Sequence, residues 1–113
     1  FGENPLPFAP MRRFQHPPIH SVALTQVLHA LSDPVRLEIV RTLAKGGEKT
    51  CAELDGGRPK STMSHHFRVL RECGVVRTRN EGVTHFNAVR KEELERRFPG
   101  LLEAILAVKS GLT

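Results

Sequence analysis

Short polar and basic side chains recur between residues 60 and 79 of this 113-residue chain. Serine, threonine and histidine side chains can hydrogen-bond the edges of DNA bases, and lysine and arginine can hold phosphates. Such residue types gathered in one short stretch favour binding to a nucleic acid. The candidates for these contacts are Lys60, Ser61, Thr62, Ser64, His65, Arg68, Arg71, Arg77 and Arg79.

An apolar stripe indicates which side of this stretch faces a core. Met63, Phe67 and Leu70 recur at helical spacing and predict a helix over residues 61–73. His66 lies next to the stripe, so we expect it to be hydrogen-bonded within the fold. The side chains on the opposite side, which are open to a partner, are Thr62, His65, Arg68 and Val69.

Two of the polar candidates have an alternative role. Ser61 and Thr62 stand where the helix begins, and a hydroxyl at that position can cap free backbone N–H groups. For these two residues, capping and base contact remain equally open. For His65 and Arg68, which are further along the helix, contact with DNA is favoured.

Positive charge is concentrated in the same region. The chain carries a net charge of +5 and has a pI of about 9.9. Residues 58–79 hold six lysines and arginines and one acidic residue, an excess equal to that of the whole chain. A solvated basic surface is the alternative, but charge gathered on one helix and the segment after it favours a polyanion as partner.

A hairpin is predicted directly after the helix. Residues 75–78 and 83–87 are rich in β-forming residues, and the loop of residues 79–82 ends in Gly82, which can supply a positive φ. Arg77 and Arg79 flank the wing and are expected to reach phosphates. The sequence thus predicts a wing beside the polar helix.

Three helices are predicted before the polar helix. Leu24, Val27, Leu28 and Leu31 predict the first helix, over residues 20–31. Asp33 is suited to cap the second helix and Pro34 to begin it. A short third helix spans residues 50–55, with Thr50 as its expected cap.

The pattern of elements predicts a mainly α fold with a small β-hairpin wing, a winged helix-turn-helix. Residues 1–18 contain five of the eight prolines and are expected to form a proline-rich arm. Residues 19–113 are expected to form a single DNA-binding and dimerisation domain. The dimer contact is predicted on the first helix and on a terminal amphipathic helix, through Leu24, Val27, Leu101, Leu102 and Ile105.

Two sequence blocks resemble the ArsR/SmtB family of winged helix-turn-helix regulators. The first follows the family's recognition helix at Ser64, His66, Phe67, Leu70, Arg71, Cys73 and Gly74. The second, residues 30–40, is similar to the family's opening of the second helix, with Asp33-Pro34 followed by Arg36 and Leu37. The resemblance covers about residues 20–98 and implies a homodimeric repressor whose recognition helix, residues 61–73, lies in the major groove.

The usual metal-sensing patterns of that family are missing from this sequence. The third helix offers Cys51 alone, in place of a Cys-x-Cys pair, and residues 100–111 contain no His, Cys or Asp. The interval from Leu54 to Ser64 is also shorter than is usual. We therefore expect no metal and no cofactor. Two alternatives stay open: an unusual metal site built from His16, His20 and Cys51, or a thiol switch at Cys51.

The sequence favours a sequence-specific DNA-binding transcriptional regulator in the cytosol. No apolar run approaches the length of a membrane span. No nucleophile elbow, phosphate loop or metal-hydrolase motif occurs, so no enzymatic activity is expected. The alternative from another class is a winged-helix module that binds a protein. The inducing signal and the operator are not encoded in any pattern.

Overall fold

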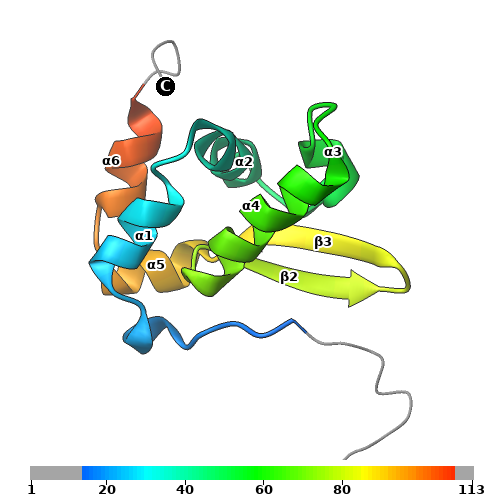
Figure 1. Cartoon of the computed structure of the whole chain (residues 1–113). Coiled ribbons are helices and arrows are strands. Elements are labelled where there is room, and N and C mark those ends of the chain that lie inside the picture. Colours follow the sequence, from blue (N-terminus) through cyan, green and yellow to red (C-terminus); the bar gives the residue numbers. More distant parts are fainter. Residues whose placement is uncertain (1–13, 109–113) are drawn as a thin grey trace, which may run out of the picture.

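The computed structural model describes residues 14–108, so the first 13 residues of the predicted arm and residues 109–113 lie outside the described part. The chain is mainly helical and has a small antiparallel sheet whose hairpin projects to one side, which confirms the predicted fold class (Figure 1). In chain order the elements are η1 (Ile19–Ser21), α1 (Leu24–Ala30), α2 (Pro34–Ala44), β1 (Lys49–Thr50), α3 (Cys51–Leu54), α4 (Lys60–Glu72), β2 (Val76–Glu81), β3 (Thr84–Val89), α5 (Lys91–Arg97) and α6 (Leu101–Ala107).

The two predicted caps are confirmed. The Asp33 carboxylate accepts hydrogen bonds from the backbone N–H groups of Val35, at 2.8 Å, and Arg36, at 3.1 Å, and Pro34 is the first residue of α2. The Thr50 hydroxyl accepts a hydrogen bond from the Glu53 N–H, while the Glu53 carboxylate accepts one from the Thr50 N–H. Both caps depend on residues two or three positions apart, which is why the sequence predicts them.

The predicted first helix is wrong over residues 20–23. The chain there forms the short 3₁₀ turn η1 and then an extended step through Val22 and Ala23, so α1 begins only at Leu24. Val22 is fully buried and lies against Gly74, which follows Cys73, the C-cap residue of α4. Burial of Val22 under the end of another helix is a long-range packing effect that local helical spacing does not reveal.

The hairpin is longer and its turn tighter than predicted. β2 and β3 pair from Val76 opposite Val89 to Glu81 opposite Thr84, which leaves a two-residue turn of Gly82 and Val83. Gly82 has a φ of 64° at the first central position, where two-residue hairpin turns need a positive φ. Arg79 therefore lies within a strand and not in the predicted loop. The two-residue strand β1, which was not predicted, completes the sheet in the order β1-β3-β2.

One apolar core joins the helices to the sheet. Met63, Phe67 and Leu70 of α4 are buried in it, as their spacing predicted. Other buried members include Val27, Ile39, Val40, Val75, Val76, Leu94 and Leu102. No helix among residues 14–108 is long and apolar enough to cross a membrane.

Two residues of the predicted dimer contact belong to this core. Val27 is 1% exposed and Leu102 is 7% exposed in a single chain, so neither has much surface to offer a second subunit, and we correct that assignment. Leu24, at 45% exposure, stays available, as does Leu28, at 43%. Leu101 and Ile105 are partly buried and pack against the core.

Candidate nucleic-acid interface

The hydroxyl side chains at the start of α4 form no hydrogen bonds within the described structure. Pro59 occupies the N-cap position and no side chain caps the helix. Ser61, Thr62 and Ser64 are exposed, and no hydrogen bond joins their hydroxyls to another residue in the range 14–108. The capping alternative for Ser61 and Thr62 therefore does not apply in this structure. His65 and Arg68 are exposed on the same helix.

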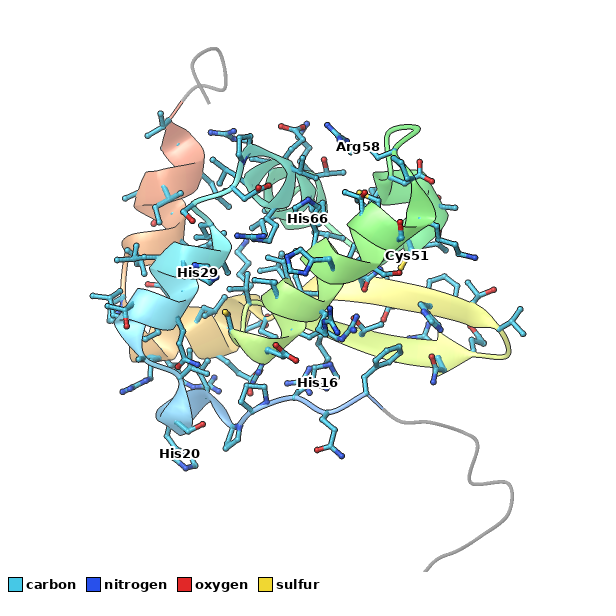
Figure 2. The ribbon with its side chains drawn as sticks, viewed as in Figure 1. His16, His20, His29, Cys51, Arg58 and His66 are labelled. Atoms are coloured by element: carbon cyan, nitrogen blue, oxygen red, sulfur yellow. The ribbon has the colours of Figure 1, made fainter. Side chains whose placement is uncertain are left out.

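His66 is buried, as expected, and lies on the side of α4 that faces α2 (Figure 2). Its Nδ1 lies 3.2 Å from Nη1 of Arg36, a buried residue of α2. The Arg36 Nε donates to the carbonyl of Ala30 at 2.8 Å, where α1 ends. Burial lowers the pKa of His66, which favours the neutral ring as an acceptor for the Arg36 guanidinium. This contact links the ends of α1 and α2 to the middle of α4.

Both wing arginines hold carboxylates of other elements. Arg77 Nη2 lies 2.7 Å from a Glu93 oxygen of α5. Arg79 donates two hydrogen bonds of 2.8 Å to the carboxylate of Glu48, which precedes β1. Hydrogen bonds from Arg90 and Arg77 lower the pKa of Glu93 to about 2. Each wing arginine is half-exposed and keeps donors for a phosphate, but its charge is locally neutralised.

Arg71 is also engaged within the chain. Its guanidinium carbon lies 4.4 Å from the centre of the Phe14 ring, which comes from the segment before η1. Arg71 is half-buried, unlike the exposed Arg68 one turn earlier. A guanidinium stacked on an aromatic face has less freedom to reach a phosphate.

The positive field is therefore narrower than the sequence indicates. Three carboxylates from outside residues 58–79, those of Glu48, Glu81 and Glu93, gather on the wing. By contrast, no carboxylate in the described part of the chain lies within ion-pair distance of Lys60 or Arg68. The unneutralised cations of the predicted set thus stand on α4, beside the free hydroxyls and His65.

The structure does not bring together His16, His20 and Cys51, the three residues of the alternative metal site. Across residues 14–108, no group of three His, Cys, Asp or Glu side chains is placed to hold a metal ion. His16 Nε2 instead accepts a hydrogen bond of 3.0 Å from the Thr78 N–H, and His20 is exposed on η1. Cys51 is half-buried, with its Sγ 3.4 Å from Nδ2 of the buried Asn87.

Sequence reasoning missed the partners of the basic side chains. Glu48 is 31 positions from Arg79, and His16 is 62 positions from Thr78. No local spacing pattern signals contacts of that range. The burial of Arg36 was not predicted either, since its partner His66 is 30 positions away.

Known proteins with similar sequences are helix-turn-helix regulators. A helix-turn-helix domain model matches residues 31–79. The uncharacterized HTH-type transcriptional regulator YceK of Bacillus subtilis (strain 168) is 39% identical over 83 residues, which cover 71% of this chain and 83% of YceK. The arsenical resistance operon repressor of Staphylococcus xylosus is 36% identical over 73 residues, or 64% of this chain and 70% of the repressor.

A solved structure is similar in both sequence and shape. It is the homodimeric winged helix-turn-helix DNA-binding domain Mb0332 of Mycobacterium bovis, a possible ArsR-family transcriptional regulator. The match covers 74% of this chain and 78% of that one, with 27% identity and a TM-score of 0.61. The identity to the two curated relatives and this structural match together establish the family. The chain belongs to the ArsR/SmtB family of winged helix-turn-helix transcriptional regulators.

Proposed function

We propose that this protein is a homodimeric repressor that recognises operator DNA through the exposed face of α4. The observation that carries the proposal is the set of exposed polar side chains on α4 that have no hydrogen-bond or ion-pair partner in the described structure. Hydroxyl groups and an imidazole match the donors and acceptors displayed in the major groove. In this arrangement Ser61, Thr62, Ser64 and His65 meet base edges.

Phosphate contacts come chiefly from α4 as well. Lys60 begins the helix and Arg68 stands two turns later, so the two cations bracket the base-reading side chains. The free N–H groups of the first turn add a further attraction for a phosphate. Arg71, Arg77 and Arg79 contribute less, because Phe14, Glu93 and Glu48 already engage them.

A second subunit is expected at the end of the molecule opposite the wing tip, where α1 and α6 lie (Figure 1). Leu24 and Leu28 are one turn apart on α1 and almost half-exposed, and Val108, directly after α6, is 59% exposed. An apolar surface of this kind on a small chain favours a partner. The homodimeric state of the Mb0332 domain supports the same arrangement here. Two recognition helices would then meet half-sites about one duplex turn apart.

Repression follows from occupancy of the promoter. The relative from Staphylococcus xylosus is named as an operon repressor, which supports the same direction of regulation for this protein.

A gel-shift assay with duplex DNA from the region upstream of the protein's own gene tests the proposal. Wild-type protein should shift this duplex at concentrations where a random duplex stays free. Arg68→Ala should weaken operator binding about 10-fold or more, whereas Arg96→Ala, an exposed arginine of α5 at the opposite end, should not. Equal effects of the two substitutions would reject α4 as the binding face.

A further inference from the structure

A short segment before η1 is hydrogen-bonded to the outer strand of the wing, β2 (Figure 2). We call residues Phe14–Pro18 the strap. β2 is an edge strand of the sheet, because among residues 14–108 its only ladder partner is β3. The Thr78 N–H of β2 donates a 3.0 Å hydrogen bond to His16 Nε2, and Arg90 Nη1 donates a 2.8 Å hydrogen bond to the carbonyl of Pro17.

The other end of the strap lies between the recognition helix and the wing. The Phe14 ring makes an edge contact with the His85 ring of β3, with 5.0 Å between ring centres. The guanidinium of Arg71, near the end of α4, stacks on the same Phe14 ring. One aromatic side chain thus contacts both α4 and the wing.

The bond to Thr78 requires a neutral His16. Its Nε2 accepts the hydrogen bond, so the ring proton must be on Nδ1. Burial lowers the pKa of His16, and the positive charges of Arg77, Arg90 and Arg71 lower it further, while Glu93 opposes them. A protonated ring would lose the acceptor and place a fourth cation among three arginines.

We propose that the strap is a positioning segment for DNA recognition, which holds the wing and α4 in a fixed relation only while His16 is neutral. This inference rests on the proposed function, because its readout is operator affinity. A wing and helix held together in advance lose less conformational freedom when they bind a duplex. His16 and Phe14 act through Thr78, His85 and Arg71, so neither needs to touch DNA.

The direction of the pH effect follows from His16. Its pKa in the docked strap lies below the ordinary 6.5, so docking is fully stabilised above about pH 6.5 and is lost as the pH falls through the lower docked value. Operator affinity should decline over the same range. Burial also lowers the pKa of His66, so the test must compare variants at each pH.

The first measurement uses the protein alone. Hydrogen exchange of the Thr78 amide should be about 10-fold or more faster in His16→Ala than in the wild type, while His16→Gln, which keeps an acceptor, should protect it. His20→Ala is the matched control, because His20 is exposed on the neighbouring turn. If the Thr78 amide exchanges at the same rate in His16→Ala as in the wild type, the proposed role of the strap is overturned, even if the protein binds DNA.

The second measurement is operator affinity between pH 5.5 and 8. At pH 8, His16→Ala and Phe14→Ala should each bind about 5- to 10-fold more weakly than the wild type, and His16→Gln should bind as the wild type does. As the pH falls, the wild type should weaken relative to His16→Gln. A constant ratio between these two proteins, or tighter binding by Phe14→Ala, would overturn the proposal. Absence of operator binding by the wild type at every pH would instead reject the proposed function and this inference with it.

Discussion

The single residues of α4 divide into those that hold the fold and those that face solvent, and this division could be predicted from spacing. Met63, Phe67 and Leu70 are buried and His65 and Arg68 are exposed, because helical periodicity alone sets these directions. The partners of Arg71 and Arg79 could not be predicted in this way. They depend on Phe14 and Glu48, which the fold brings from distant positions.

A first prediction separates base reading from phosphate holding. His65→Ala should weaken operator binding by about 1–3 kcal/mol and random-duplex binding by less, because a lost base contact matters only where the base is correct. Lys60→Ala should weaken both alike. Fluorescence anisotropy with matched operator and random duplexes measures the four affinities, and an equal loss on both duplexes for His65→Ala would remove it from the base-reading set.

A second prediction concerns the glycine after α4. Gly74 has a φ of 80°, and a Cβ there would lie 2.5 Å from Cγ2 of the buried Val22. Gly74→Ala should therefore reduce the free energy of unfolding by about 2 kcal/mol or more. Gly57→Ala is the control, since Gly57 has a φ of 82° with no atom within 4 Å of a Cβ. Equal losses in urea denaturation would show that backbone strain alone acts at Gly74.

At the scale of elements, ion pairs with Glu93 of α5 and with Glu48 neutralise the arginines of the wing and connect it to its neighbours. Strand identity and the role of Gly82 followed from β-forming residues and turn chemistry. The strand ends did not, because the ladder continues through polar residues up to Glu81 and Thr84. The short strand β1 offers no sequence signal, since two residues show no periodicity.

A third prediction tests the tie between the wing and α5. The pKa of Glu93, lowered to about 2 from an ordinary 4.5, means that its carboxylate stabilises the fold above about pH 4.5 and loses this effect as the pH falls toward 2. Glu93→Gln should lower the free energy of unfolding at pH 7 by about 1 kcal/mol, a modest value because the ion pairs are partly solvated.

The difference between Glu93→Gln and the wild type should shrink as the pH falls below about 4.5. Glu92→Gln, an exposed neighbour on α5, provides the control and should unfold as the wild type does. Chemical denaturation at several pH values measures all three proteins. A stability gap that does not depend on pH would contradict the assigned role of the Glu93 carboxylate.

At the scale of the whole molecule, the wing tip and the surface proposed for a second subunit are separate. The wing tip, between β2 and β3, lies at the end of the molecule away from α1 and α6 (Figure 1). The general layout was predictable because the order of helices and hairpin follows from periodicity and caps. The distribution of charge was not predictable. Three carboxylates from outside residues 58–79, those of Glu48, Glu81 and Glu93, form ion pairs with the wing arginines.

A fourth prediction concerns assembly. Multi-angle light scattering at micromolar concentration should give about twice the 12.6 kDa of one chain. A double substitution of Leu24→Asp and Leu28→Asp should return it to one chain, since charges on that apolar face oppose contact with a second subunit. A wild-type mass of one chain across the micromolar range would contradict the dimer.

The salt dependence of operator binding tests the central claim most directly. With Lys60 and Arg68 of two subunits on phosphates and the wing arginines neutralised, the slope of log affinity against log salt should be about −4. The charge-reversing variant Arg68→Glu should flatten this slope, and operator DNA should be preferred over random DNA at every salt concentration. A slope near zero, or equal affinity for operator and random duplexes, would contradict recognition of DNA by the exposed face of α4.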